Sequence, residues 1–379
     1  MSDAAVANRS KILCVLPSMN GGGAERVMLL LLAGLDSSKY QPVLVLFEKK
    51  GAYLEEIPAD IQVHCLEKKT KLDVLRLPFR LARLIRQERP SVVLSFLWYA
   101  NLINVLSSCV RLHSVPIIIS VHNFLSASLT IQKYSEIKRF ITRLLFSRAN
   151  EVISVSRAAS YDLASGFNIP KHKISVIYNG IDKAHIARRS GERPEQNYFD
   201  GEASVIVAVG RLSKQKGFDV LIRAFAEVRK KHMVKLLILG EGAERSRLES
   251  IAVELGVSGY VNMPGFVSNP YAYIKRSSLY VMSSNFEGFP VVLLEVMACG
   301  VPIISTACTS GPEEILENGV TGILVNVGNV GELSGSICNL LGDPVKAEQL
   351  ALNAKRKVDD WTIEKMVENH ERLISKYCA

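Results

Sequence analysis

The chain has 379 residues, of which 48% are hydrophobic and 22% charged, and at about 150 residues per domain this length predicts two globular domains. The composition excludes a disordered chain, and the sequence shows no heptad run or fixed repeat, which excludes fibrous and solenoid folds. The net charge of +9 comes from the first half: residues 1–190 hold 26 basic and 14 acidic residues, whereas residues 191–379 hold 20 and 23. A basic first half predicts contact with an anionic partner.

Cysteine usage and the beginning of the chain indicate the compartment. The seven cysteines are scattered and form no CxxC pair, so neither a disulfide framework nor a structural zinc site is predicted. The apolar run 12–17 is too short for a secretory signal. Two uncharged stretches, 90–110 and 112–132, approach the length of a membrane span, but their prolines and amides favour a buried strand followed by a helix. A cytoplasmic location is therefore expected.

Short apolar runs alternate with amphipathic segments along the whole chain, which is the pattern of parallel sheets covered by helices. The predicted strands of the first half are 11–17, 42–48, 91–97, 116–121, 151–155 and 174–178, with helices at 24–35, 71–87 and 134–148. The predicted strands of the second half are 204–209, 234–239, 260–264, 279–283, 302–305 and 322–325. Two such series predict an α/β protein of two Rossmann-like domains, with the active site in the interdomain cleft.

A polar stretch that separates the two series marks the predicted domain boundary. We expect an N-terminal domain at 1–185, a linker at 186–202, a C-terminal domain at 203–357 and a final helix at 358–379. The pattern alone does not assign this final helix to either domain.

Two predicted strand ends carry residues that suit a phosphate. In the first, Gly21-Gly22-Gly23 lets backbone amides approach an anion at a helix N-terminus, although a plain strand-to-helix turn explains it equally well. A dinucleotide fingerprint is less favoured, because Arg26 stands where a third glycine is needed. In the second, Arg211 and Lys216 offer cations to a diphosphate, and two solvated loop cations are the alternative.

A third segment contains two glutamates seven residues apart. Glu287 precedes a predicted helix at 291–299, and Glu295 lies within its apolar sequence. A carboxylate in apolar surroundings needs hydrogen-bond donors, which the diol of a ribose or a sugar supplies. The amides of residues 288–292, near the helix start, can bind a phosphate or sugar oxygen. The alternative for Glu295 is a pair with a nearby cation.

Taken in order, these segments resemble a known family. The run Glu287-Gly288-Phe289-Pro290…Glu295…Ala298-Cys299-Gly300-Val301-Pro302-Ile303 is similar to the glutamate-x7-glutamate signature of retaining glycosyltransferase family 4 (glycosyltransferase group 1), which has the GT-B fold and here resembles the type that assembles bacterial polysaccharides and glycolipids. Gly210-Arg211-Leu212 with Lys216-Gly217 resembles its diphosphate-binding loop, and Asn179-Gly180-Ile181-Asp182 its segment ahead of the interdomain linker. The glycine loop at 21–23 matches in place, so the resemblance covers nearly the whole chain.

The resemblance implies roles for the residues of the second half. Arg211 and Lys216 would bind the diphosphate of a nucleotide-sugar donor, and Glu295 would bind its ribose. Glu287 would hold hydroxyls of the transferred sugar, assisted by the backbone of Gly288, Phe289, Pro290 and Val291. Phe266 and Val267 fall where the family holds the base.

It also implies roles in the first half. Gly22 and Gly23 would close over the phosphates. His122, at a predicted strand end, matches the family histidine that faces the donor sugar, although a lone histidine there is otherwise an ordinary satisfied polar residue. We take His122 and Glu287 as the catalytic candidates. In this family the final helix returns to the N-terminal domain.

The sequence contains no Asp-x-Asp motif, so we expect no metal and no other cofactor. The charge on the leaving diphosphate would then be balanced by Arg211, Lys216 and backbone dipoles. No residue stands out as a covalent nucleophile, and the resemblance implies a front-face substitution with retention, in which the departing diphosphate helps to deprotonate the acceptor.

Basic residues of the first half gather around two predicted helices. Residues 67–89 hold eight basic and three acidic residues, with an apolar stripe of Leu77, Leu81, Leu84 and Ile85 beside Arg76, Arg80, Arg83 and Arg86. In the second helix, Phe140, Leu144 and Leu145 are flanked by Lys138, Arg139 and Arg143. Such helices rest on anionic membranes, or are ordinary domain helices with a solvated basic face. Nucleic acid is not expected, because no aromatic-rich basic strand motif accompanies the charge.

The sequence thus predicts a retaining, metal-independent glycosyltransferase. It would move a hexose or N-acetylhexosamine from a nucleotide sugar, with UDP favoured by the resemblance, to a membrane-linked glycan or lipid at the cytoplasmic face of the inner membrane. Two alternatives stay open: a nucleotide-sugar epimerase of the same fold, which would need no acceptor, and a non-enzymatic basic protein that binds anionic membranes.

Overall fold

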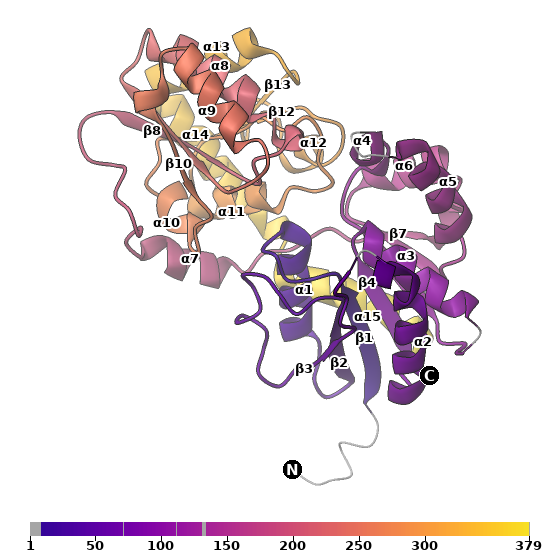
Figure 1. Cartoon of the computed structure of the whole chain (residues 1–379). Coiled ribbons are helices and arrows are strands. Elements are labelled where there is room, and N and C mark those ends of the chain that lie inside the picture. Colours follow the sequence, from indigo (N-terminus) through magenta and orange to yellow (C-terminus); the bar gives the residue numbers. More distant parts are fainter. Residues whose placement is uncertain (1–8, 71, 111, 131–133, 379) are drawn as a thin grey trace. The chain divides into compact units, whose positions relative to one another are not determined.

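The computed structural model describes residues 9–70, 72–110, 112–130 and 134–378 and divides the chain into two compact units (Figure 1). Unit 1 comprises Met1–Gly180 and Ile363–Ala379, and unit 2 comprises Ile181–Thr362. The division at Gly180 falls inside the segment 179–182 noted above. Residues 1–8, 71, 111, 131–133 and 379, which several predicted ranges include, lie outside the described residues.

Unit 1 is built on a seven-stranded parallel sheet with the order β3-β2-β1-β4-β5-β6-β7. Its strands are β1 (Ser10–Leu16), β2 (Tyr40–Leu46), β3 (Gln62–Cys65), β4 (Val92–Phe96), β5 (Ile117–Val121), β6 (Glu151–Ser154) and β7 (Ile174–Val176). Its helices are α1 (Gly23–Gly34), α2 (Leu77–Glu88), α3 (Trp98–Cys109), α4 (Leu125–Thr130), α5 (Ser135–Phe146), α6 (Arg157–Phe167) and α15 (Ile363–Ile374), with 3-10 turns η2 (Leu72–Leu75), η3 (Lys171–Lys173) and η7 (Ser375–Tyr377).

Unit 2 is built on a six-stranded parallel sheet with the order β10-β9-β8-β11-β12-β13. Its strands are β8 (Ser204–Val209), β9 (Val234–Leu239), β10 (Val261–Gly265), β11 (Leu279–Met282), β12 (Ile303–Thr306) and β13 (Ile323–Val325). Its helices are α7 (Lys183–Gly191), α8 (Phe218–Arg229), α9 (Arg245–Glu254), α10 (Pro270–Ile274), α11 (Val291–Cys299), α12 (Pro312–Ile315), α13 (Val330–Gly342) and α14 (Pro344–Lys357), with 3-10 turns η4 (Lys214–Lys216), η5 (Ser258–Tyr260) and η6 (Val358–Asp360).

The prediction of two Rossmann-like domains with parallel sheets is confirmed. The uncharged stretches 90–110 and 112–132 contain β4 with α3 and β5 with α4, and both strands are fully buried, which explains their continuous apolar sequence. No helix among the described residues is long and apolar enough to cross a membrane. The sequence patterns missed β3, because this edge strand is only half buried and carries polar residues.

Strand order places the loops that carry the predicted site residues. In each sheet the order reverses beside the first strand, between β1 and β4 in unit 1 and between β8 and β11 in unit 2. Ligands of such sheets bind at this reversal, outside the carboxyl ends of the strands. The loop after β1 carries Gly22 and Gly23, and the loops after β8 and β11 carry Lys216 and Glu287.

The last helix belongs to unit 1, where α15 packs against α1. A Cβ atom at Gly34 would lie 2.6 Å from Cγ2 of Val367, so the two helices approach closely at this glycine. Glu371 Oε1 accepts a hydrogen bond from the backbone N–H of Asp36 at 2.8 Å. The polar stretch between the two predicted series contains α7, which packs against α10 and α11 within unit 2.

The apolar stripe of the first basic helix does not face outward, as a membrane-bound helix would require. The stripe of α2 formed by Leu77, Leu81, Leu84 and Ile85 is buried in the core against the sheet, so it is not available to a membrane. In α5, Leu145 is likewise buried, whereas Phe140 and Leu144 are exposed. Crossover helices must cover the sheet, and this requirement decides which stripe points inward.

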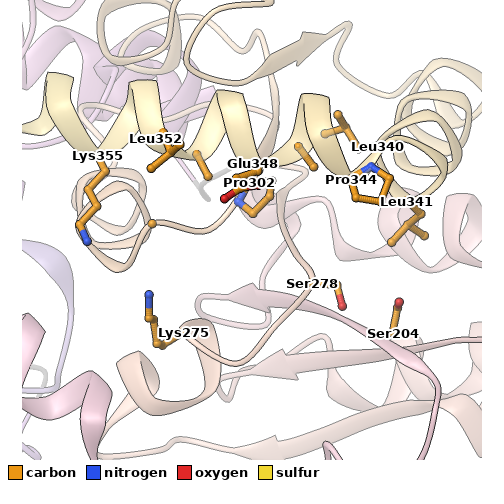
Figure 2. A pocket seen from close by; sticks show the side chains of 13 residues that line it. Ser204, Lys275, Ser278, Pro302, Leu340, Leu341, Pro344, Glu348, Leu352 and Lys355 are labelled. Carbon is orange, nitrogen blue, oxygen red and sulfur yellow. The ribbon is translucent and has the colours of Figure 1, made fainter.

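A cavity of about 520 Å³ lies at the amino ends of the strands of unit 2, beside Ser204, Ser278 and Pro302 (Figure 2). Figure 2 shows Lys275 and Lys355 pointing toward each other at one end of it. None of the predicted site residues lines this cavity, because they follow the opposite, carboxyl ends of the strands.

Candidate functional site

Two loops of unit 2 meet at the reversal of strand order, the loop after β8 and the loop after β11. Gly217 has φ +59°, and a Cβ atom there would lie 2.2 Å from the carbonyl oxygen of Ser283, so only glycine allows this approach. The hydroxyl of Ser283 donates to the carbonyl of Lys216 at 2.9 Å, and the N–H of Asn285 donates to the carbonyl of Gln215 at 2.7 Å. These contacts set the relative positions of the two loops.

Lys216 and Glu287 form an ion pair across these loops. Nζ of Lys216 lies 2.7 Å from Oε1 of Glu287, and the two side chains are only 17% and 8% exposed. The hydroxyl of Ser284 donates to the same carboxylate oxygen at 2.6 Å, and Gln215 Nε2 donates to the other at 3.4 Å. The sequence assigned these two residues to different parts of a ligand, and the structure shows that they also bind each other.

Arg211 lies on the same loop as Lys216, but its side chain is exposed. Among the residues that the structure describes, its guanidinium has no hydrogen-bond or ion-pair partner. Lys216 has its charge balanced by Glu287, whereas the charge of Arg211, like that of the exposed Lys214, is not balanced by any described residue. A guanidinium in this state can bind two oxygens of an anionic ligand.

The start of α11 follows Glu287 directly and has no side-chain cap. The loop after β12 supports it: the hydroxyl of Ser310 donates to the carbonyl of Gly288 at 2.7 Å, and a Cβ atom at Gly311 would lie 2.6 Å from Pro290. Of the backbone positions 288–291 proposed from the sequence, Pro290 has no amide hydrogen and cannot donate. Its carbonyl instead accepts from the N–H of Leu293 at 3.0 Å.

Glu295 lies in the second turn of α11 and is half buried. The hydroxyl of Tyr271, on α10, donates to its Oε1 at 2.9 Å. Tyr271 is itself almost fully buried, so its hydroxyl contacts the Glu295 carboxylate from the protein interior and orients it. Sequence reasoning considered a cation for this role and missed the tyrosine, because α10 is distant from Glu295 along the chain.

Two buried groups lie close to the glutamates. The pKa of the Tyr280 hydroxyl is raised by burial and, to a smaller extent, by the negative charges of Glu287 and Glu295. Burial also raises the pKa of the Cys308 thiol to about 12, so this thiol stays protonated and is a poor nucleophile.

The sequence analysis did not identify Ser284, Gln215 and Ser310, which contact the site loops. Their position in loops after strand ends is the only signal that could have indicated them.

Phe266 and Val267 follow β10, which is separated from β8 by β9 in the sheet. The ring of Phe266 is 52% exposed, although phenylalanine usually prefers the core. An exposed aromatic ring at the carboxyl edge of the sheet is suited to stacking on a planar base.

In unit 1, His122 follows β5 and is packed against the ring of Phe96, with ring centroids 4.4 Å apart. Its Nε2 lies 3.1 Å from the hydroxyl of Ser120. Burial, with a smaller contribution from nearby His370, lowers the pKa of His122 to about 3. The imidazole is therefore neutral near pH 7, so it can hydrogen-bond a hydroxyl but carries no charge.

The glycine loop of unit 1 precedes α1, whose N-cap is Gly22 and whose N-terminus has no side-chain cap. A Cβ atom at Gly22 would lie 2.6 Å from Oε2 of Glu25, which is buried in the first turn, whereas the space around Gly23 is open. A side chain at Gly22 would thus displace the carboxylate of Glu25, whereas Gly23 leaves room for a ligand to approach the backbone.

Two family models match the chain, one in each half. The model of glycosyltransferase family 4 matches residues 21–185, and the model of glycosyl transferases group 1 matches residues 190–357. A relative from Campylobacter jejuni, N-acetylgalactosamine-N,N'-diacetylbacillosaminyl-diphospho-undecaprenol 4-alpha-N-acetylgalactosaminyltransferase, is 31% identical over 86% of this chain and 88% of its own length. The chain belongs to the family 4 glycosyltransferases.

Further comparisons agree. The lipopolysaccharide core biosynthesis glycosyltransferase LpsE of Rhizobium meliloti is 25% identical over 87% of this chain and 88% of its own length. Among solved structures, Anabaena Alr3699/HepE in complex with UDP-glucose is 22% identical and superposes with a TM-score of 0.82, covering 97% of this chain and 100% of that one. At this identity the structural likeness shows the fold, and it confirms the predicted GT-B type. Family membership makes this chain a glycosyltransferase and disfavours the epimerase and the non-enzymatic alternative.

Proposed function

We propose that this family 4 glycosyltransferase is retaining and metal-independent, and that it transfers a hexose or N-acetylhexosamine from a UDP-sugar to a membrane-linked glycan or lipid on the cytoplasmic face of a bacterial inner membrane. The observation that carries the acceptor class is the Campylobacter jejuni relative, whose name specifies a diphospho-undecaprenol-linked acceptor. UDP as the nucleotide is supported by the UDP-glucose bound to the Anabaena protein of the same fold.

The charges of unit 2 suit the donor. The pair of Lys216 and Glu287 is neutral as a unit, so Arg211 supplies the net positive charge for the diphosphate, together with the uncapped N-terminus of α11. Lys216 Nζ carries two further N–H groups beyond the one directed at Glu287, and these are available to a phosphate oxygen.

The two glutamates then bind the remaining parts of the donor, the ribose and the transferred sugar. Glu295, oriented by Tyr271, accepts hydrogen bonds from the ribose hydroxyls. Glu287 has its Oε1 occupied by Lys216 and Ser284, whereas its Oε2 has only the long contact with Gln215. This second oxygen therefore retains the capacity to accept a hydroxyl of the transferred sugar. For the candidate residues of unit 1 we keep the roles that the resemblance implies, with neutral His122 for the sugar and the amides of Gly22 and Gly23 for the phosphates.

The reaction breaks the bond between the anomeric carbon and the oxygen of the UDP diphosphate. The acceptor oxygen bonds to the same face of that carbon, and its proton passes to the departing phosphate oxygen. Arg211 and Lys216 stabilise the charge that develops on the diphosphate, which is the part of the transition state that most needs compensation. No covalent intermediate on the protein is required.

The test is an incubation of the full chain with radiolabelled UDP-glucose, UDP-galactose, UDP-N-acetylglucosamine or UDP-N-acetylgalactosamine and a bacterial membrane extract. Label that moves into the organic-solvent phase supports the proposal. Label that stays water-soluble as an altered nucleotide sugar would indicate an epimerase, and no turnover of any donor would contradict enzymatic function with these donors.

Two further measurements test the mechanism. The anomeric configuration of the product, read by NMR from an α-linked donor, should be α, and a β product would overturn retention. Transfer should persist in excess EDTA, because cationic side chains and dipoles take the place of a divalent ion. Loss of activity in EDTA that Mg²⁺ or Mn²⁺ restores would contradict metal independence.

A further inference from the structure

Unit 1 carries two exposed apolar stripes, one at the start of α2 and one along α5. The first, stripe A, consists of Leu72, Leu75 and Phe79, which are 79%, 74% and 60% exposed. Residues three apart in a 3-10 turn eclipse each other, so Leu72 and Leu75 of η2 lie side by side. The second, stripe B, recurs at helical spacing and consists of Tyr134, Ile137, Phe140 and Leu144, all exposed.

Neither stripe is needed to build the core. Helix α2 covers the sheet with Leu77, Leu81 and Ile85, and α5 does so with Leu145 and Phe146. Helix α5 therefore has a second apolar face that the fold leaves in water, and so does the segment formed by η2 and the first turn of α2. Contiguous exposed apolar side chains on a soluble unit indicate an interaction surface.

Cations accompany both stripes. Arg83 and Arg86 continue the outward face of α2 four and seven residues after Phe79, and Arg76 precedes it; all three are exposed. Within the described part of the chain, their guanidinium groups bind no other residue. Residues 134–148 hold four basic residues and one acidic residue. The two helices thus combine exposed apolar side chains with an excess of basic over acidic residues, which is complementary to anionic lipid headgroups.

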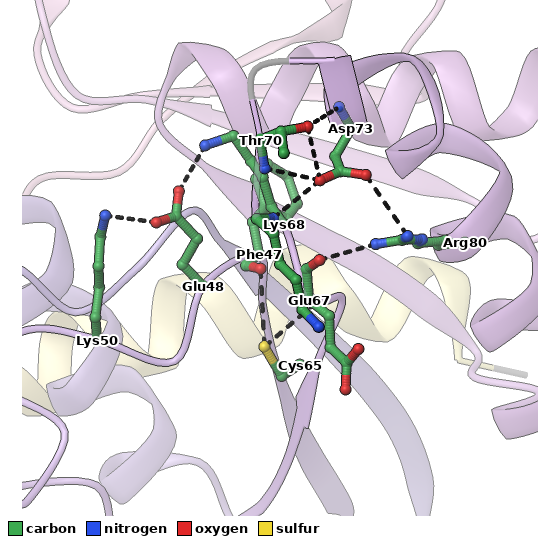
Figure 3. A network of polar contacts seen from close by, with 10 residues as sticks. Phe47, Glu48, Lys50, Cys65, Glu67, Lys68, Thr70, Asp73 and Arg80 are labelled. Atoms are coloured by element: carbon green, nitrogen blue, oxygen red, sulfur yellow. Dashed lines mark hydrogen bonds and ion pairs between the residues drawn. The ribbon is translucent and has the colours of Figure 1, made fainter.

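The segment that leads into stripe A is held by a polar network (Figure 3). The carboxylate of Asp73 accepts hydrogen bonds from the N–H groups of Lys69 and Thr70 at 3.0 and 2.8 Å. Arg80 donates to the carbonyls of Leu66 and Glu67 at 2.6 and 3.0 Å. The exposed leucines of η2 are therefore presented by a braced segment, and Arg80 is part of the brace rather than a free cation.

Topology places both stripes on one side of unit 1. Helix α3 packs against both α2 and α5. Each of these two helices connects parallel strands, β3 to β4 and β5 to β6, so each begins at the carboxyl edge of the sheet. His122 follows β5 at this same edge. Stripe A and the first residues of stripe B thus lie toward the edge that carries the candidate site of unit 1.

We propose that this face of unit 1 docks on an anionic lipid bilayer, with the side chains of stripes A and B inserted among the acyl chains and Arg76, Arg83 and Arg86 on lipid phosphates. The role of the surface rests on the proposed function, because it brings the site to a membrane-linked acceptor. Lipid binding itself needs neither donor nor acceptor, so its test can fail without contradicting the transferase assignment.

The experiment is co-sedimentation of the full chain with vesicles of phosphatidylcholine alone or with about 30% phosphatidylglycerol. An apolar variant carries Leu75→Ser, Phe79→Ser and Phe140→Ser, and a charge variant carries Arg76→Gln, Arg83→Gln and Arg86→Gln. The matched control removes three equally exposed apolar side chains from unit 2, with Met233→Ser, Val253→Ser and Val345→Ser. All the replaced residues are exposed, so the thermal midpoints should stay close to that of the wild type.

We expect the wild type and the control to bind the anionic vesicles. The apolar variant should bind them at least about 10-fold more weakly, because each inserted side chain contributes the transfer free energy of its apolar surface. The charge variant should lose the preference for phosphatidylglycerol, and high salt should weaken the wild type in the same way. UDP affinity should be unchanged in all variants.

Three outcomes would overturn the proposal. One is vesicle binding by the apolar variant that equals the wild type, and another is an equal loss in the unit 2 control. The third is a wild type that does not bind vesicles but forms a dimer that the apolar variant cannot form. The stripes would then contact a second copy of the chain.

Discussion

Lys216 and Glu287 stand 71 residues apart in the chain, yet Nζ of one lies 2.7 Å from Oε1 of the other in a nearly closed environment. Both belong to motifs for which the resemblance to the family predicts donor binding. The pair joins the loops after β8 and β11, and it holds in place the carboxylate that we propose binds the sugar. The first role leads to a prediction about stability, and the second to a prediction about sugar binding.

The first prediction concerns stability. Lys216→Met leaves the buried carboxylate of Glu287 with only Ser284 and Gln215, and the loss of one partner from a buried pair costs about 3–5 kcal/mol. Glu287→Gln should be similarly costly, and the double variant should cost clearly less than the sum of the two. Trp361 lies in unit 2, so its fluorescence during urea unfolding, in a Trp98→Phe background, reports this unit.

The control for this cycle is Lys214→Met, an exposed lysine of the same loop, which should change the free energy of unfolding by less than about 0.5 kcal/mol. If the two single variants prove additive, the ion pair does not couple the loops.

In contrast to Lys216, Arg211 should matter for UDP binding and not for stability. Its side chain is exposed and has no partner in the described structure, so Arg211→Ala should leave the thermal midpoint unchanged. It should weaken UDP binding at least about 10-fold by calorimetry and reduce kcat/KM about 100-fold, because the guanidinium proposed to bind the diphosphate is lost. Arg223→Ala, an exposed arginine of α8, is the matched control and should change neither value. Unaltered UDP affinity in Arg211→Ala would remove this residue from the diphosphate site.

The two glutamates should separate nucleotide binding from sugar binding. Glu295→Gln should weaken UDP and the UDP-sugar to the same extent, by about 1.5–3 kcal/mol, because the ribose is common to both ligands. Tyr271→Phe should produce a smaller loss of the same kind, since it removes only the hydroxyl that orients Glu295.

Glu287→Gln should instead spare UDP and reduce sugar transfer, because its free oxygen is proposed to contact only the transferred sugar. Calorimetry with UDP and steady-state kinetics with the UDP-sugar distinguish the two cases. Equal losses of UDP affinity in Glu287→Gln and Glu295→Gln would contradict the division of roles.

The buried histidines of unit 1 predict how its stability depends on pH. Burial lowers the pKa of His370 to about 4, whereas an unfolded histidine titrates near 6.5. Between these values the unfolded chain binds a proton that the folded unit does not, so stability is present at neutral pH and is lost as the pH falls below about 6.5. His122, whose pKa is lowered in the same direction, adds to this trend.

The change His370→Gln should therefore reduce the loss of unfolding free energy between pH 7 and pH 5 by about 1–2 kcal/mol, measured by urea unfolding in a Trp361→Phe background with Trp98 as the probe of unit 1. His172→Gln is the control, because His172 is exposed on η3 and should not alter the pH dependence. A pH dependence identical to wild type in His370→Gln would mean that His370 is protonated in the folded unit.

Local sequence was sufficient to predict the buried strands of the two sheets and the loops that carry the candidate site residues. Buried parallel strands are continuously apolar and short, so 204–209 and 234–239 could be predicted to the residue, and glycines and glutamates at strand ends indicated the loops after β1, β8 and β11. The edge strand β3 was not predicted, because half-exposed strands lack a continuous apolar sequence. The roles of the predicted site residues remain predictions that the variants above test.

Only the tertiary structure decided which side chains meet. Glu287 meets Lys216 and Glu295 meets Tyr271, and neither pairing has a sequence signal, because each joins separate loops or helices that only the folded unit brings together. The same holds for the apolar residues at α2: one group is the stripe around Leu81, and another is Phe79 with Leu72 and Leu75 of η2, and the sequence pattern alone does not say which group is buried. The sheet buries the first and leaves the second in water, because a helix that connects two parallel strands can pack only one of its faces against them.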